Sequence, residues 1–424
     1  MDKHAERKAN EKKLEEYSLL DPQVHACPYE FFQRLRNECP VYRMPETGTY
    51  MITRYEDIRA IKRNPVDFTS NITVQERGKD RIELMKEHDG ILAKYGWDNV
   101  QTLQRTDPPQ HTRWRQLIDR TFTASRVREL KPHIDAMVHQ LVDDWINDGA
   151  CEFVSQYAIP LPCKVIAGQL GVGDTDFWKL KTWSDAMLEP ASPTCPPEKV
   201  PQHAHSVVEA QHHFYQVFED RRKNPRDDIM SSLVNSDMGD QPPLTMHELQ
   251  NLMNQLLTGG NETTTSALSH AMWNLLKFPE QMARLRADRS WLKNFVEETL
   301  RFETPVLGLA RKTTRDVEVH GTPIPEGSMV VLTYAAANRD EEKFEDGEDF
   351  DVTRKNAGAH IAFGMGAHFC PGAMLARQEI LSTFEILLDR LDDIELARPL
   401  PDETHQPSVF LHQMKELPIR FKKR

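Results

Sequence analysis

The sequence predicts a mainly α-helical protein with small β-sheets, and three observations support this fold class. Helical periodicity dominates residues 110–300, strand-like segments are short and lie near the two ends, and no linker or internal repeat divides the chain. A chain of 424 residues, 39% hydrophobic and 28% charged, has the composition of a globular protein with a large core. We therefore expect one large domain over residues 21–424, preceded by a charged, poorly ordered segment over residues 1–20.

The segments near the ends of the chain are expected to include strands. Residues 49–53, 316–320 and 328–332 have short patterns typical of strands, and the turn-rich sequence GTPIPEG separates the last two. Residues 189–201 contain five prolines and connect two helical patterns. This segment is interpreted as a loop, which is either a lid over a cleft or a plain surface connection.

The clearest helix is expected over residues 246–278. Thr245 and Glu248 have the spacing of a capping box at its start, and Pro279 ends it. Apolar residues then recur at the spacing of one helix face: Leu249, Leu252, Met253, Leu256 and Leu257. A helix of this size is roughly 50 Å long, which is enough to cross the whole molecule.

Charge and cysteine content exclude several classes of protein. A net charge of −12 argues against general binding to nucleic-acid phosphates. The first residues are charged throughout and no run of about 18 apolar residues occurs, so we expect no secretion signal, no membrane anchor and a cytoplasmic location. The cysteines show no CxxC pairing, which disfavours a disulfide framework or a zinc site. The pairs His203–His205 and His212–His213 are interpreted as surface residues rather than metal ligands.

The centre of the long helix has an unusual composition for a helix. Residues 258–265 read TGGNETTT, and each glycine costs about 1 kcal/mol relative to alanine in a helix. We expect a distortion here that frees backbone carbonyls and lets a flat ligand approach Gly259. Glu262 and Thr263 then place a carboxylate beside a hydroxyl, as candidate catalytic groups. The alternative is a kinked core helix whose threonine hydroxyls bond to the preceding turn.

A glycine-rich loop over residues 363–372 precedes a strong helical pattern and reads FGMGAHFCPG. Pro371 fits the first helical position, which would place Cys370 at the helix N-cap. There the free N–H groups and the helix dipole favour a thiolate, the form of cysteine that binds haem iron. The alternative is a buried structural cysteine that caps a helix. A further pair, Glu298 and Arg301, has helical i, i+3 spacing and on its own would be an ordinary surface salt bridge.

Taken together, these residues resemble the signatures of the cytochrome P450 family, in the family's order. The cysteine loop matches F-x-x-G-x-[HR]-x-C-x-G at Phe363, Gly366, His368, Cys370 and Gly372. The helix motif [AG]-G-x-[DE]-T-[TS] is matched by Gly259, Gly260, Glu262, Thr263 and Thr264. The E-x-x-R motif corresponds to Glu298 and Arg301. Residues 107–115 and 336–354 also resemble family segments, so the resemblance covers residues 28–421.

The resemblance implies a fold with haem b between the long distal helix and the helix after the cysteine loop. It makes Cys370 the axial ligand of the haem iron. Glu262 and Thr263 become the acid–alcohol pair that delivers protons during oxygen activation, although many bacterial relatives have Asp in place of Glu262. The implied contacts with the haem propionates and ring come from His111, Arg115, Arg311, His368, Phe363 and Gly364. Glu298, Arg301 and Arg354 would form a structural cradle.

By the same resemblance, the chain is expected to be a monomeric monooxygenase of the soluble bacterial type. Electrons would come from a ferredoxin and its NAD(P)H-dependent reductase, docked on a basic patch that includes Arg113, Arg115 and Arg377. Two alternatives stay open: a peroxide-driven oxygenase, and a haem protein that binds a ligand without oxygenating it. The acid–alcohol pair argues against both.

The expected substrate is an apolar organic molecule of small to medium size, such as a terpenoid, an aromatic compound or a steroid. One wall of its pocket is expected within residues 81–103. Each lining residue could equally belong to the core. The expected lining residues are Leu84, Trp97, Val100, Gly259, Leu307, Leu309, Phe410 and Leu411.

Overall fold

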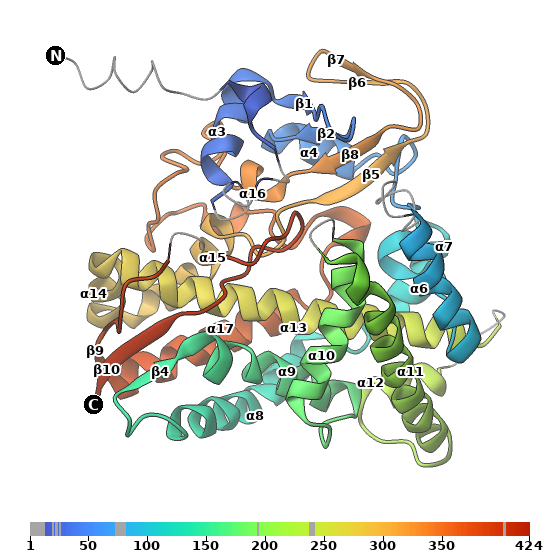
Figure 1. Cartoon of the computed structure of the whole chain (residues 1–424). Helices are drawn as coiled ribbons and strands as arrows, with labels where there is room; N and C mark the ends of the chain where they lie inside the picture. Colours follow the sequence, from blue (N-terminus) through green and yellow to red (C-terminus); the bar gives the residue numbers. More distant parts are fainter. Residues whose placement is uncertain are drawn as a thin grey trace.

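The computed structural model describes residues 13–18, 21, 24, 27–72, 82–192, 195–236, 242–401 and 404–424, and it is dominated by helices (Figure 1). The helices are α3 (Tyr29–Glu38), α4 (Tyr55–Lys62), α6 (Ile82–Tyr95), α7 (Gln110–Asp119), α8 (Ala124–Asp143), α9 (Pro160–Leu170), α10 (Phe177–Leu188), α11 (Val200–Lys223), α12 (Ile229–Val234), α13 (Met246–Lys277), α14 (Pro279–Ala287), α15 (Leu292–Phe302), α16 (Tyr334–Ala337) and α17 (Ala373–Arg390). The strands are β1 (Val41–Arg43), β2 (Tyr50–Ile52), β3 (Phe68–Thr69), β4 (Ala150–Glu152), β5 (Leu309–Thr313), β6 (Val317–Val319), β7 (Thr322–Ile324), β8 (Met329–Leu332), β9 (Leu391–Leu396) and β10 (Pro418–Lys423). The predicted fold class, helix-rich with small sheets, is confirmed.

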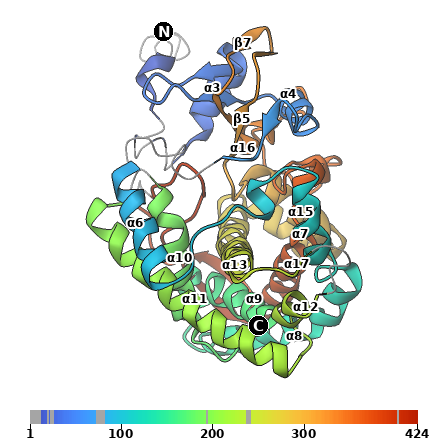
Figure 2. The same cartoon turned by 90° about the vertical axis from the view of Figure 1, so that its right-hand side faces the viewer.

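Helix α13 begins and ends where the sequence predicts. The backbone N–H of Glu248 donates to the Thr245 hydroxyl at 3.2 Å, and the N–H of Thr245 donates to the Glu248 carboxylate at 2.8 Å. The helix ends at Lys277, and Pro279 starts α14. In Figure 2, α13 is seen nearly end-on in the middle of the molecule, with other helices around it. Helix α13 is therefore the central helix, and other helices of the molecule lie around it (Figure 2).

The sequence predicts a distortion of the helix at Gly259 and Gly260, and the structure shows α13 as one uninterrupted helix through this stretch. A Cβ added at Gly260 would lie 2.8 Å from Ile166 of α9, so this glycine allows α9 to pack closely. A Cβ at Gly259 would meet nothing within 4 Å, so this glycine borders open space. Gly260 thus allows close packing of α9, and Gly259 leaves the surface of α13 open at this position.

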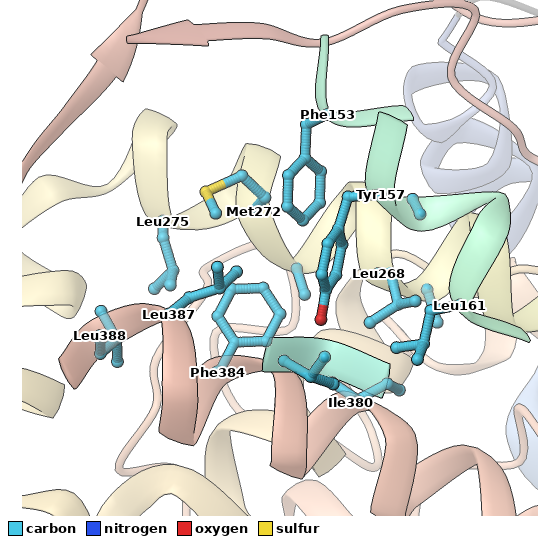
Figure 3. Close-up of a cluster of buried hydrophobic side chains, with 14 of the residues drawn as sticks. Phe153, Tyr157, Leu161, Leu268, Met272, Leu275, Ile380, Phe384, Leu387 and Leu388 are labelled. Atoms are coloured by element: carbon cyan, nitrogen blue, oxygen red, sulfur yellow. The ribbon is translucent and has the colours of Figure 1, made fainter. Parts of the chain in front are cut away.

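A hydrophobic core joins α13 to α17 and to the segment before α9 (Figure 3). Phe153 and Tyr157 stack with ring centroids 5.0 Å apart, and Phe384 of α17 packs into the same cluster. The Tyr157 hydroxyl donates to Thr383 at 2.8 Å, which satisfies the polar atom of this buried ring. This core fixes the distance between the long helix and the helix that follows the cysteine loop.

The sheets are small and lie in two regions of the molecule: the strands β1, β2, β5 and β8 are at the top of Figure 1, and the sheet of β4, β9 and β10 is at the lower left. The largest sheet has the order β1-β2-β8-β5-β3, and only its β2–β8 pair is parallel. All three predicted strands are present as β2, β6 and β8. The prediction for residues 321–327 was incomplete, because this stretch also contains β7, which pairs with β6 as a hairpin.

The proline-rich segment connects α10 to α11, as predicted. It contains short 3-10 helices at Glu189–Ala191 and Pro197–Lys199, while Pro193 and Thr194 lie outside the described residues. The last of its five prolines, Pro201, already belongs to α11. Within the part of the chain that the structure describes, no helix is both long and apolar enough to cross a membrane.

Candidate active site

A cavity lies between α13 on one side and the cysteine loop with α17 on the other. Gly259, Glu262 and Thr263 line it from α13, and Phe363, Gly364 and Cys370 line it from the loop. His111, Arg115, Arg311 and His368 also border it. The fold thus brings together, around one cavity, every residue that the sequence analysis assigned to catalysis or to the cofactor.

Cys370 is held by the backbone of its own loop. Its N–H donates to the carbonyl of Phe363 at 2.9 Å, and Gly364 and Gly366 turn the chain with φ angles of 70° and 66°. Such positive φ angles favour glycine, which explains two of the three glycines in the loop. The fixed loop directs a single sulfur atom into the cavity wall.

The expectation that Cys370 is the N-cap was wrong, because α17 begins at Ala373 and its N-cap is Gly372. The sulfur nevertheless lies within hydrogen-bonding reach of the backbone N–H groups of Gly372 and Ala373. Burial is the largest effect and raises the pKa of the Cys370 thiol, while these N–H groups and Arg115 oppose the rise. Coordination to a metal ion removes the thiol proton of a cysteine.

One end of the cavity is lined by polar side chains. Arg311 lines it, and the rings of His111 and His368 lie 4.3 Å apart there. The hydroxyl of Tyr334, which also lines the cavity, is buried and has no hydrogen-bond partner. The ammonium group of Lys62, which is not among the lining residues, is likewise buried without a hydrogen-bond partner. Burial, followed by the charge of Arg311, lowers the pKa of Lys62 to about 6. Buried donors of this kind fit the carboxylate side chains of a flat cofactor.

Arg115 of α7 binds the backbone of the cysteine loop. Its guanidinium donates to the carbonyl of Phe369 and, at 3.4 Å, to that of Ala367. It also pairs with Asp119 at 2.7 Å. The other two arginines of the expected docking patch are likewise paired: Arg113 with Glu248 and Arg377 with Glu297. Arg113 is thus bound to the start of α13 and not to the cysteine loop.

Glu262 and Thr263 differ in how they are held. The Thr263 hydroxyl donates to the carbonyl of Gly259 at 2.7 Å, four residues back, as the alternative interpretation expected. The Glu262 carboxylate is 2% exposed. It accepts from Gln413 at 2.7 Å and from Asn261 at 3.0 Å, and it lies 3.5 Å from the ammonium group of Lys181.

Lys181 and Asp185 of α10 extend this polar cluster toward the surface. Lys181 is ion-paired with both Glu262 and Asp185, and its pKa is raised because these carboxylates outweigh the effect of burial. Burial raises the pKa of Asp185 to about 6, with Glu262 adding to the rise and Lys181 opposing it. The carboxyl group of Asp185 can therefore exchange a proton near neutral pH, and Lys181 connects it to Glu262.

The pair Glu298–Arg301 is buried and is not a surface salt bridge. Both side chains are 0% exposed, and the guanidinium binds the carboxylate through two contacts of 2.7 and 2.8 Å. Arg354 adds a third contact to Glu298 at 3.1 Å. The remaining N–H groups of Arg301 donate to backbone carbonyls of residues 338, 347 and 349. These three residues form the cradle that the resemblance implied.

The eight residues expected to line the substrate pocket do not all border the cavity. Gly259, Leu309, Phe410 and Leu411 line the cavity, whereas Leu84, Trp97, Val100 and Leu307 are not among its lining residues. Trp97 instead stacks on Tyr215 of α11, with ring centroids 5.3 Å apart. Leu307 belongs to the core cluster under the first sheet. In the sequence, apolar residues that line a pocket show the same pattern as apolar residues of the core, so the two cannot be distinguished.

Leu103, at the end of the segment 81–103 that was expected to form one wall, lines the cavity. Other lining residues were not predicted at all, and they include Gln104, Phe122, Ile166, Leu188, Gln255, Val306 and Tyr334. Most come from segments without a motif, and tertiary folding brings them to the cavity. For Leu188 a signal existed, since it immediately precedes the proline-rich segment interpreted as a possible lid.

Comparisons with known proteins decide the family. The family model for cytochrome P450 matches residues 74–419, which is most of the chain. This chain is a cytochrome P450. It is 34% identical over 393 residues to cytochrome P450 107B1 of Saccharopolyspora erythraea, with 92% of this chain and 94% of the relative covered.

Two further matches agree. This P450 is 33% identical over 391 residues to linalool 8-monooxygenase of Pseudomonas putida, covering 91% of this chain and 94% of the relative. The solved structure of CYP109Q5 from Chondromyces apiculatus superposes with a TM-score of 0.83 at 33% identity, covering 97% of this chain and 100% of that chain. The protein is thus a P450 monooxygenase, an oxidoreductase of the haem-thiolate class. The sulfur, the open Gly259 wall and the buried donors without acceptors fit such a cofactor.

Proposed function

We propose that this P450 inserts one oxygen atom of O2 into apolar organic molecules of small to medium size, with haem b held by Cys370. The observation that carries this proposal is the pairing of a cysteine sulfur on one wall of the cavity with Glu262 and Thr263 on the opposite wall. A haem protein that only binds a ligand needs the cysteine sulfur to hold the iron, but it does not need the acid–alcohol pair. The acid–alcohol pair is needed only where protons are consumed.

Haem, when bound, supplies the activation of O2 and the oxidising power, and the thiolate ligand favours O–O cleavage. The chain's residues do the rest. Arg311, His111 and His368 would bind the cofactor carboxylates, and the unpaired Tyr334 hydroxyl would gain an acceptor. The loop that contains Cys370 keeps the sulfur in a fixed position. Arg115 donates to the carbonyls of Ala367 and Phe369, and the Phe363 carbonyl accepts from the Cys370 N–H.

Proton delivery falls to Thr263 and Glu262. The Thr263 hydroxyl gives its hydrogen to the Gly259 carbonyl, so its oxygen lone pairs are available to a water in the cavity. Glu262 connects that water to the polar cluster of Lys181 and Asp185, which is partly open to solvent. Lys181 and Gln413 hold the Glu262 carboxylate in place. When Glu262 has taken up a proton, rotation of its carboxyl group toward Thr263 would carry that proton inward.

The substrate class rests on the character of the cavity wall opposite the cysteine loop. Leu103, Ile166, Leu188, Phe410 and Leu411 supply apolar surface, while Gln104 and Gln255 offer two amides that could orient a hydroxyl or carbonyl group. This lining supports a mostly apolar substrate with few polar groups, such as a terpenoid, an aromatic compound or a steroid. One named relative, linalool 8-monooxygenase, is consistent with this size range.

We propose a ferredoxin and its NAD(P)H-dependent reductase as electron donors. The deciding experiment compares product formation with NAD(P)H, ferredoxin and reductase against product formation with hydrogen peroxide alone, using compounds that shift the haem spectrum on binding. We expect hydroxylated product only with the electron-transfer proteins. Efficient turnover with peroxide alone would favour the peroxide-driven alternative. Binding without product in either system would favour the ligand-binding alternative.

A further inference from the structure

The proline-rich segment between α10 and α11 brings three metal-ligating side chains together. Glu189 follows the last residue of α10, Cys195 lies within the segment, and His203 is in the first turn of α11. One ligand atom from each of the three lies within 4.8 Å of the other two. The Nε2 atom of His203 is 3.0 Å from a carboxylate oxygen of Glu189.

We propose that Glu189, Cys195 and His203 form a zinc-binding site. A thiolate, an imidazole and a carboxylate are the three ligand types that Zn²⁺ prefers in proteins. Tetrahedral bonds of about 2.0–2.3 Å place neighbouring ligand atoms roughly 3.2–3.7 Å apart. The ligand atoms, all within 4.8 Å of one another, can therefore reach the separations of a bound site by side-chain rotation.

The surroundings of His203 support this assignment. Its Nε2 atom is buried and lies 3.0 Å from the Glu189 carboxylate, so the ligand nitrogen already faces the oxygen that would share the ion.

The site is shielded on one side and open on the other. Cys195 is 6% exposed, whereas the Glu189 side chain is 48% exposed. Three protein ligands and an open face are typical of a zinc ion that keeps one water molecule. This zinc ion would be bound by a surface segment, far less tightly enclosed than the ion of a four-cysteine site.

A second histidine group in the described part of the chain does not suit a metal ion. His270, His405 and His412 are buried together, but their rings are nearly parallel, with interplanar angles of 9–11°. The Nε2 atoms of His270 and His405 face each other at 3.0 Å, the distance of a hydrogen bond. Since a metal ion lies in the plane of each imidazole that binds it, stacked parallel rings cannot share one ion.

Zinc at the first site would join the end of α10 to the start of α11. Leu188, the residue before Glu189, lines the active-site cavity. α10 also contains Lys181, which pairs with Glu262. Bound zinc would therefore restrain the segment between the two helices and slow the entry and exit of substrates, without touching the reacting groups.

The test titrates haem-loaded protein, freed of exchangeable metal, with zinc chloride by isothermal titration calorimetry. We expect one site per chain in the wild type, and binding at least about 10-fold weaker in Cys195→Ser and in His203→Ala. Cys27→Ser and His205→Ala are matched controls, since Cys27 and His205 are exposed and lie outside the cluster. Both controls should bind zinc like the wild type. X-ray absorption at the zinc edge should show one sulfur neighbour at about 2.3 Å.

Haem content and the carbon monoxide spectrum show whether each variant is folded, and they are independent of zinc. If Cys195→Ser fails to fold, His203→Ala provides the same comparison. The proposal is wrong if the wild type binds no zinc, if both cluster variants bind it unchanged, or if the zinc edge shows no sulfur. Loss of monooxygenase activity with normal zinc binding would instead count against the proposed function alone.

Discussion

At the scale of single residues, the site depends on hydrogen bonds that no motif specifies. Glu262 and Thr263 were predicted from the sequence, because a carboxylate and a hydroxyl in a glycine-containing helix are conspicuous. Gln413 and Lys181, which hold Glu262, were not predicted, since they come from remote segments and have ordinary neighbours in the chain. The motif thus indicates which polar groups of α13 border the cavity, whereas tertiary folding determines what holds them.

Replacement of Thr263 by alanine tests the proposed proton route. Thr263→Ala removes the hydroxyl that borders the cavity, while the helix keeps its backbone bonds and haem binding is unaffected. We expect NAD(P)H consumption to continue, with less product and more hydrogen peroxide per NAD(P)H consumed. The control is Thr265→Ala, whose hydroxyl donates to Ala158 and does not line the cavity. An unchanged ratio of product to NAD(P)H in Thr263→Ala would remove the proposed role of this hydroxyl.

His270 predicts a pH dependence of stability. Burial, followed by the charge of His412, lowers the pKa of His270 to about 4 in the folded protein. In the unfolded chain the pKa of histidine is about 6.5. The unfolded state therefore takes up a proton first as the pH falls, and the contribution of His270 to the free energy of unfolding drops by about 2 kcal/mol between pH 7.5 and pH 5.

Urea denaturation of the wild type and of His270→Gln at these two pH values measures this contribution. The variant should be less stable at pH 7.5 but should lose less stability on acidification. His205→Gln, at an exposed position of α11, is the control and should keep the wild-type difference. The same loss of stability in His270→Gln and in the wild type would show that His270 does not titrate as described.

At the scale of elements, the long helix could be predicted better than the strands. The helix α13 has 32 residues and a capping box, so its periodicity and both ends could be predicted. The strands β1, β4 and β7 were not predicted, although β2 and β6 are equally short, because strand pairing depends on partners that are remote in the chain. Pro371 suggested a helix start that lies two residues too early, because the cysteine loop continues through Gly372.

The cradle that joins α15 to residues 338–354 predicts a large effect on stability. Glu298→Ala leaves Arg301 and Arg354 without their carboxylate, and Arg301 is completely buried. Breaking a buried pair in this way costs about 3–5 kcal/mol. We expect poor folding or loss of haem, measured by the yield of haem-containing protein and by thermal denaturation.

The control for this cradle variant is the exposed pair Arg34–Glu38, which has side-chain exposures of 18% and 48%. Glu38→Ala should cost only about 0.2–1 kcal/mol. Stable protein with a full haem content from Glu298→Ala would contradict the structural role of the buried pair.

At the scale of the whole molecule, two walls built from distant parts of the chain meet across one cavity. The core around Tyr157 and Phe384 sets the distance between α13 and α17 (Figure 3). The cysteine loop and α17 together border the cavity opposite α13. The mainly helical fold and the single domain follow from composition and periodicity. The exact lining of the cavity does not, because it depends on which apolar side chains face inward.

The central claim is that Cys370 binds the haem iron through its sulfur. The measurement that tests it most directly is the absorption spectrum of the reduced carbon monoxide complex, recorded for the wild type, Cys370→Ala and Cys163→Ala. Cys163 is a buried cysteine of α9 and is the matched control. We expect the wild type and Cys163→Ala to show the red-shifted Soret band of thiolate ligation, and Cys370→Ala to lack it. Persistence of that band in Cys370→Ala would contradict the account.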